Sequence, residues 1–281
     1  MAILIPVEDR VSAYPGRVKL TPVSGQTNVY DMVRADDPVQ EGTPLNKALL
    51  DQKADRMTRD VTIYVTPSGN DAEGDGSSAA PFATIQAAVN ALPKCLGGYT
   101  ATIDVAAGTY NERVNVDGFF GGLLTIGEAG RTVVVRGFSI TNSNTVRLNI
   151  SNLTWASGFS GTLLRLANGS TVIIGSGMTV RCEGSSEVAV GVTYGSTLIA
   201  NGATVTVLNC TQSAIRATYG ANAVFATITG SGNTSVGLLA ELGSIISYTE
   251  SHLTSTGGNA SRTGGRILTG SGSELANASM V

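Results

Sequence analysis

Carboxylate side chains are the first candidates for chemistry in this chain. Cleavage of a glycosidic bond needs two carboxylates about 5 to 10 Å apart, and Glu183 and Glu187 form the best candidate pair, separated by a short loop. The other acids of interest lie at unrelated positions of the repeats described below, or upstream of them: Asp104, Glu112, Asp117, Glu128, Glu241, Glu250 and Glu274. We therefore expect Glu183 and Glu187 to be solvated loop residues, with catalysis as the alternative. For the upstream acids we expect capping and turn roles.

Metal ligands and nucleophiles are poorly represented. His252 is the only histidine, and no serine lies in a GxSxG motif. The sequence therefore predicts neither a multi-histidine metal site nor a serine hydrolase. Oxygen donors occur at calcium-like spacing in the segment 70–75, without the frame of an EF-hand. We interpret this segment as a turn-rich loop, and we expect no metal and no cofactor.

The three cysteines form neither a CxxC motif nor an even set. They are Cys95, Cys182 and Cys210. Cys182 and Cys210 lie about one repeat apart, at similar places in successive repeats. We predict two stacked thiols in the core, where cysteine acts as a small hydrophobe. A disulfide or a metal site is the alternative.

Two tyrosines are the candidates for ligand binding. Tyr194 and Tyr219 each precede a glycine that opens a repeat, so in stacked coils they should lie one above the other, about 4.8 Å apart. They are in phase with the alternating apolar positions, which predicts a buried or boundary stack that stabilises the coils. In the alternative interpretation their hydroxyl groups, with Trp155 or Tyr248 nearby, form an amphipathic platform for a sugar ring.

A repeating framework must position these residues. Three successive segments of about 23 to 26 residues resemble one another, and each begins with glycine: GSTVIIGSGMTVRCEGSSEVAVGVTY, GSTLIANGATVTVLNCTQSAIRATY and GANAVFATITGSGNTSVGLLAEL. Apolar residues alternate before each repeat glycine, as Val188, Val190 and Val192 do before Gly195. The segments are rich in Val, Ile and Thr and contain no run of helix formers. This pattern predicts a mainly β protein, a parallel β-helix with three faces and repeats from about residue 100.

Charge composition argues against two classes of partner. Charged residues make up 14% of the chain, the net charge is −3, and no lysine follows Lys94. A surface of this kind gives no electrostatic basis for binding nucleic acid or anionic lipid. Residues 1–10 lack the basic and long apolar regions of a signal peptide, and no run reaches the ~20 apolar residues of a membrane span. We therefore expect a protein made in the cytoplasm, without membrane insertion.

Two segments precede the repeats. Residues 1–60 contain several prolines and alternate weakly, which predicts a small attachment module that needs a partner. Within it, Thr43 and Pro44 favour a short helix over 44–56, with a pure linker as the alternative. The β-helix should occupy residues 61–281. An amphipathic helix predicted over 82–93, with Phe82, Ile85 and Val89 on one face, should cap the exposed edge of its first coil.

Two stretches resemble known proteins. The stretch YVTPSGNDAEGDGSSAAPFATIQAAVNAL, followed by ATIDVAAGTYNERVNV, resembles the opening of pectin-lyase-like right-handed β-helix proteins, which include many phage tailspikes and tail fibres. The earlier stretch YDMVRADDPVQEGTPLNKALLDQKAD resembles the N-terminal region of phage tail fibre or receptor-binding proteins. Together they cover about residues 30–116. The resemblance implies a right-handed β-helix, a homotrimer, a location in the virion, and attachment to a tail or baseplate protein through residues 1–60.

The resemblance leads to alternative functions. The first is a structural and host-recognition protein of a phage or phage-like tail, which binds a host surface glycan. The second is a tailspike depolymerase, a hydrolase or lyase that cleaves such a glycan. The small set of acids and the modest length favour the first, because depolymerase spikes that resemble this start are usually much longer. A secreted β-helix protein unrelated to phages is a third hypothesis, which the absence of a signal peptide disfavours.

Overall fold

A computed structural model describes residues 56–154, 161–184 and 187–269, together with the short stretches 11–12, 18–25, 30–34 and 38–40. The chain divides into two units, one from Ala2 to Asp55 and one from Arg56 onward. In the first unit β1 (Val11–Ser12) pairs antiparallel with β4 (Pro38–Gln40), and β2 (Val18–Pro22) pairs antiparallel with β3 (Tyr30–Arg34). Residues 44–55 of the helix predicted over 44–56 lie outside the described residues.

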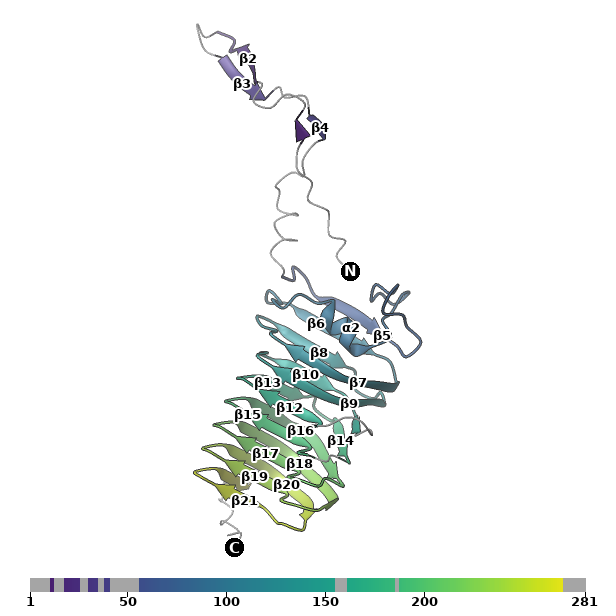
Figure 1. The fold of residues 1–281 in the computed structure, drawn as a ribbon, viewed down its shortest axis with the longest axis vertical. Coiled ribbons are helices and arrows are strands. Elements are labelled where there is room, and N and C mark those ends of the chain that lie inside the picture. The colour runs from purple at the N-terminus through teal and green to yellow at the C-terminus, as the bar shows by residue number, and fades with distance from the viewer. Residues whose placement is uncertain are drawn as a thin grey trace. The chain divides into compact units, whose positions relative to one another are not determined.

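The second unit is a parallel β-helix whose coils stack in sequence order (Figure 1). Its first face is the ladder of β5 (Val61–Val65), β6 (Thr100–Val105), β8 (Leu123–Gly127), β10 (Val146–Asn149), β13 (Thr171–Ile174), the first parts of β16 (Thr197–Leu208), β18 (Asn222–Asn233) and β20 (Ile245–Ser255), and then β22 (Arg266–Thr269). Strands far apart in sequence thus lie side by side.

Two further ladders complete each coil. The second face contains the first parts of β7 (Gly108–Asp117) and β9 (Val133–Thr141), then β11 (Asn152–Thr154), β14 (Thr179–Glu183) and the later parts of β16, β18 and β20. The third face contains the later parts of β7 and β9, then β12 (Leu164–Ala167), β15 (Val190–Thr193), β17 (Ile215–Thr218), β19 (Leu238–Glu241) and β21 (Ala260–Arg262). The predicted three-faced parallel β-helix is confirmed.

Alternation along each strand builds the core. In a strand, side chains at every second position point to the same side, so equivalent residues of successive coils form columns inside the helix. One column on the first face consists of buried apolar residues in direct register: Val146, Val172, Leu198, Ala223, Ile246 and Ile267. The inward positions of the third face form similar columns, such as Leu164, Val190, Ile215 and Leu238. The coils are therefore held together by both hydrogen bonds and apolar burial.

Turns of one kind connect the third face to the first. In Tyr194-Gly195 the two φ angles are 51° and 68°, and in Tyr219-Gly220 they are 57° and 70°. The same left-handed pair occurs at Asn168-Gly169, Leu242-Gly243 and Thr263-Gly264. Glycine takes this conformation without steric cost, which explains why glycine opens each repeat. We call these the Xaa-Gly turns. They lie along one edge of the β-helix, together with the equivalent loops of the first coils, and we call this edge the turn edge.

Buried serines link the coils beneath the turn edge. Ser170 and Ser196 follow turn glycines and are completely buried. The Ser170 N–H donates to Ser196 Oγ at 3.2 Å, and the Ser143 N–H donates to Ser170 Oγ at 3.2 Å. The Ala221 N–H makes the same bond to Ser244 Oγ at 3.0 Å. Each hydroxyl therefore satisfies a buried backbone N–H of the preceding coil, which would otherwise be destabilising.

A short helix caps the first coil, as predicted, but it is α2 (Ile85–Asn90) rather than a helix over 82–93. Phe82 instead extends the sheet: its N–H donates to Tyr64 O at 3.0 Å, and its C=O accepts from Thr66 N at 2.9 Å. Thr84 is the N-cap, and its hydroxyl accepts from the Ala87 N–H. The buried face of α2 comprises Ile85, Ala88 and Val89.

Two carboxylates hold the start of α2. Glu112 accepts hydrogen bonds from the N–H groups of Ile85 and Gln86 at 2.7 and 2.9 Å. Asp71 accepts from the N–H groups of Ala83 and Thr84 at 2.7 and 3.0 Å. Within the segment 70–75, side-chain oxygens likewise accept from nearby backbone N–H groups. Its acids thus serve the loop and the cap, and the described residues contain no group of three or more metal-ligating side chains.

The two core cysteines are not stacked on each other. Cys182 lies in register with Val207 of the next coil, and Cys210 follows three residues later, after β16 has ended. Both thiols are free and buried, as predicted, and burial raises the pKa of Cys182. Cys182 follows its repeat glycine by 13 residues and Cys210 follows its own by 15, so Cys210 falls beyond the end of β16. Among the described helices, none is long and apolar enough to cross a membrane.

Candidate functional site

Tyr194 and Tyr219 form a stack on the turn edge. Their ring centroids are 4.7 Å apart, and the ring planes differ by 7°. This confirms the predicted stacking, because adjacent strands set nearly the same spacing. The rings are 52% and 50% exposed, so the expected phase with the core residues is wrong. The left-handed φ of each tyrosine interrupts the strand alternation and turns the ring outward.

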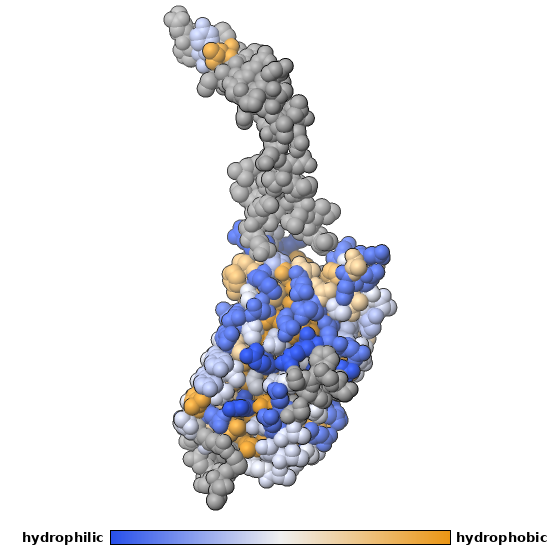
Figure 2. Space-filling view, viewed as in Figure 1, coloured by the Kyte–Doolittle hydropathy of each residue, from blue (hydrophilic) through white to orange (hydrophobic). Residues whose placement is uncertain are grey.

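Other exposed apolar residues lie along the same edge. In the described part of the β-helix, the exposed large hydrophobic side chains are Tyr99, Phe120, Tyr194, Tyr219 and Leu242. Leu242 occupies the next Xaa-Gly turn after the tyrosines, whereas Tyr99 and Phe120 belong to the loops before β6 and β8. Sequence reasoning missed Tyr99 and Phe120, although each is next to a pair of glycines before a strand. In Figure 2 hydrophobic residues on the visible face form only small separate areas.

Hydroxyl and amide groups flank the tyrosine stack. Thr193 and Thr218 directly precede the two tyrosines, and their backbones pair in register. The Thr193 hydroxyl donates to Leu166 O at 3.1 Å, while the buried Thr218 Oγ1 has no hydrogen-bond partner within the described residues. On the other side of the turn, Thr197 and Asn222 begin the first-face strands in register. Because Thr218 is buried, the accessible polar groups beyond the turn are those of Thr197 and Asn222. Exposed aromatic rings with such a polar border are suited to contact with a sugar.

Tyr248 does not join the stack. It lies on β20, in register with Phe225 of the preceding coil, six residues beyond Leu242. Its side chain packs partly against the core, and this burial raises its pKa. The first-face strand thus separates Tyr248 from the turn edge. Trp155 lies outside the described residues.

Glu183 and Glu187 have different surroundings. Glu183 forms an ion pair with Arg181 at 2.7 Å and accepts a hydrogen bond from Asn209 Nδ2 at 3.3 Å. Partial burial and the charge of Arg165 lower the pKa of Arg113, and the negative charge of Glu187 partly offsets that lowering. Each carboxylate of the candidate pair therefore acts on an arginine, which is the pattern expected for surface ion pairs.

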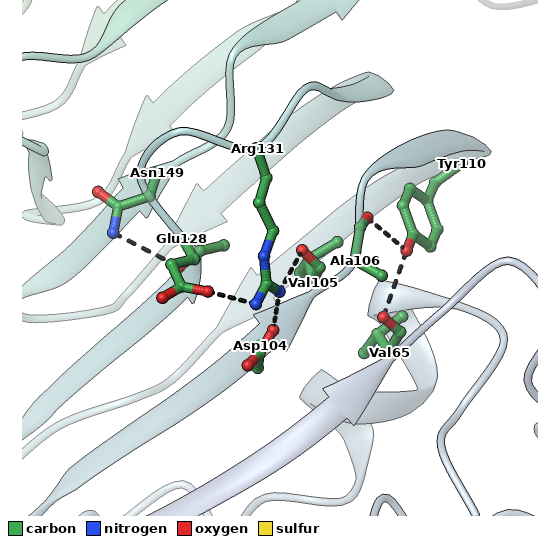
Figure 3. A network of polar contacts seen from close by, with 9 residues as sticks. Val65, Asp104, Val105, Ala106, Tyr110, Glu128, Arg131 and Asn149 are labelled. Carbon is green, nitrogen blue, oxygen red and sulfur yellow. Dashed lines mark hydrogen bonds and ion pairs between the residues drawn. The ribbon is translucent and has the colours of Figure 1, made fainter. Parts of the chain in front are cut away.

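The remaining acids have structural partners too. Arg131 lies between Asp104 and Glu128 and forms ion pairs with both (Figure 3). Glu241 pairs with Arg216 at 2.8 Å, and Glu250 lies 3.6 Å from the ring of His252. Asp117 accepts from the side chains of Thr141 and Asn142, and these hydrogen bonds lower its pKa. Glu274 lies outside the described residues.

Tyr110, near this network, provides a test by pH (Figure 3). It is 4% exposed, and its one hydroxyl proton is shared between Ala106 O at 2.9 Å and Val65 O at 3.3 Å. Burial raises the pKa of Tyr110 to about 12, with the charge of Glu112 as a second cause. The folded state favours the protonated phenol. Its contribution to stability is therefore complete below the unfolded pKa of about 10 and is lost as the pH rises through about 12.

We expect Tyr110→Phe to leave the phenolate absorbance of the folded protein at pH 11 nearly unchanged, because most Tyr110 is protonated there. The measurement is an ultraviolet titration of folded wild type and variant. After unfolding in denaturant at pH 11, the variant should have one phenolate fewer. A loss of one full phenolate in the folded state below pH 11 would contradict the shifted pKa.

Comparison with known proteins identifies no family: no family model, no curated protein and no solved structure matches the chain.

Proposed function

We propose that this chain is a structural and host-recognition component of a phage or phage-like tail, a tail fibre or receptor-binding protein. Residues 1–60 would attach it to a tail or baseplate protein, and the β-helix would present a binding surface to a host glycan. Support comes from the resemblance over about residues 30–116 and from the parallel β-helix, whose strands run from Val61 to Thr269. The proposal includes a homotrimer located in the virion, and light scattering of the full chain would test the trimer.

The tyrosine stack is the observation that carries the proposed glycan binding. Tyr194 and Tyr219 are half exposed on Xaa-Gly turns, so their exposure follows from the fold and requires no rearrangement. Exposed aromatic rings with hydroxyl groups provide both apolar contact and hydrogen bonding. A preorganised surface also loses little conformational entropy when it binds.

We expect the double change Tyr194→Ala and Tyr219→Ala to weaken binding to host cells by at least about tenfold, a loss of about 1.4 kcal/mol. The melting temperature should change by only a few degrees, because both rings are already half exposed. Tyr99→Ala is the matched control, since Tyr99 is an exposed tyrosine on the same edge but outside the stack. Cell binding that survives the double change would contradict the proposed role.

If the protein cleaved host glycan, the proposed function would have to be replaced by that of a depolymerase. The carboxylates of the β-helix described above are engaged with arginines or hydrogen-bond donors, which favours recognition without cleavage. The purified protein should be incubated with host surface polysaccharide and assayed for new reducing ends and unsaturated uronates. Appearance of either product would identify a depolymerase.

A further inference from the structure

Arginines on the outer surface of the third face differ in their partners. Arg216 on β17 pairs with Glu241 at 2.8 Å. Arg165 on β12 forms no ion pair with any described carboxylate, and its hydrogen bond is to the Ser139 hydroxyl, from Nη1 at 3.4 Å. The β-helix thus presents, on a flat strand surface, a guanidinium group whose donors are largely unused.

A second arginine lies near Arg165. Arg113, on β7, faces the same surface, and Gly137 occupies the equivalent position in the next coil. Because glycine has no side chain, Arg113 can extend along the helix axis: its Nη1 lies 2.8 Å from the point where a Cβ on Gly161 would be. Arg165 extends in the opposite direction, towards Ser139. Both side chains therefore lie over the surface of β9.

Electrostatics shows that the two arginines interact. Partial burial lowers the pKa of Arg113, and the positive charge of Arg165 lowers it further. The negative charge of Glu187 opposes both effects. The charged groups that act on Arg113 are thus one further guanidinium and one carboxylate. An anion placed between the arginines would relieve their repulsion.

Hydrogen-bonding groups adjoin the two arginines. Ser139 is in register with Arg165 on one side and with Asn115 on the other. A guanidinium binds a carboxylate through two parallel hydrogen bonds, while hydroxyl and amide side chains suit the hydroxyls of a sugar. We propose that Arg165, together with Arg113 and Ser139, forms a binding site for the carboxylate of an acidic sugar. This inference rests on the proposed function, because it names the class of host glycan.

Affinity electrophoresis in gels that contain alginate, a carboxylated polysaccharide, tests the site, with dextran as the neutral polymer and a polymer-free gel as reference. Wild type should be retarded by alginate and not by dextran, and the retardation should weaken at high salt. Arg165→Gln should lower the affinity for alginate about tenfold. Arg165→Lys should lower it less, since it keeps the charge but not the planar fork.

Arg147→Gln is the matched control. Arg147 is an outward residue of the first face, in register with Thr125 and Ile173, and its change alters the net charge equally. Equal loss of retardation in the Arg147 and Arg165 variants, or no retardation of wild type, would overturn the site. Loss confined to the Arg165 variants would support it. Cell binding by the Arg165 variant distinguishes the two proposals: normal binding together with lost retardation by alginate would support the anion site and count against its use in host recognition.

Discussion

Replacing Gly230 with alanine should lower the free energy of unfolding by about 3 kcal/mol or more. A Cβ at this position of β18 would lie 1.8 Å from the carbonyl oxygen of Val207 in the preceding coil. Gly230 also has a φ of +147°, which residues with side chains rarely adopt. Two coils would have to separate locally, breaking hydrogen bonds between β16 and β18. Chemical denaturation of the purified variant measures the loss.

Gly220→Ala is the control for this prediction. Gly220 also has a positive φ, of 70°, but no atom lies within 4 Å of its missing Cβ. Only the left-handed backbone should then be strained, at about 1 to 2 kcal/mol. Equal losses in the two variants would show that backbone conformation, and not the close approach of coils, requires Gly230.

Removing the Asn233 side chain should lower the free energy of unfolding by about 3 kcal/mol, because it leaves the buried N–H of Cys210 and the buried C=O of Val207 unpaired. Asn233 is 2% exposed. Its Oδ1 accepts from the Cys210 N–H at 3.1 Å, and its Nδ2 donates to Val207 O at 3.1 Å and to Thr254 O at 3.2 Å. One amide therefore joins the coils before and after its own.

The matched change is Asn222→Ala on the same strand. Asn222 is exposed at the start of β18, so its removal should alter stability by no more than about 0.5 kcal/mol. Urea denaturation of both variants provides the comparison. A loss below about 1 kcal/mol for Asn233→Ala would indicate that water replaces the amide.

The architecture was predictable because one short pattern specifies it repeatedly. Residues such as Val190, Ile215 and Leu238 occur at one offset before a repeat glycine, and they form one buried column. Tyr194 and Tyr219 share an offset too, which predicted their 4.7 Å stacking. The offset of a residue from a repeat glycine predicts its structural register well when the residue is close to that glycine, because no loop of variable length intervenes.

Other features depend on information that a strand pattern lacks. Alternation placed the two tyrosines in phase with the core, but left-handed turn residues break the alternation. Cys210 lies in the loop between β16 and β17, three residues beyond Val207, which is in register with Cys182. Arg113 and Arg165 lie over the same surface only because β7 and β12 pair with β9 on either side. Such contacts require the lengths of all intervening coils and cannot be obtained from local sequence.

The Xaa-Gly turns divide the β-helix into coils that begin and end with the same turn conformation. Intervals between successive turn glycines decrease from 26 to 21 residues along the chain, at Gly169, Gly195, Gly220, Gly243 and Gly264. The turn conformation is the same throughout, so the difference is absorbed by the other two edges. Joining Tyr194 to Gly220 would remove one whole coil and recreate an equivalent turn. Evolution can therefore lengthen or shorten this rod in steps of one coil, while the turn edge keeps its spacing of about 4.8 Å.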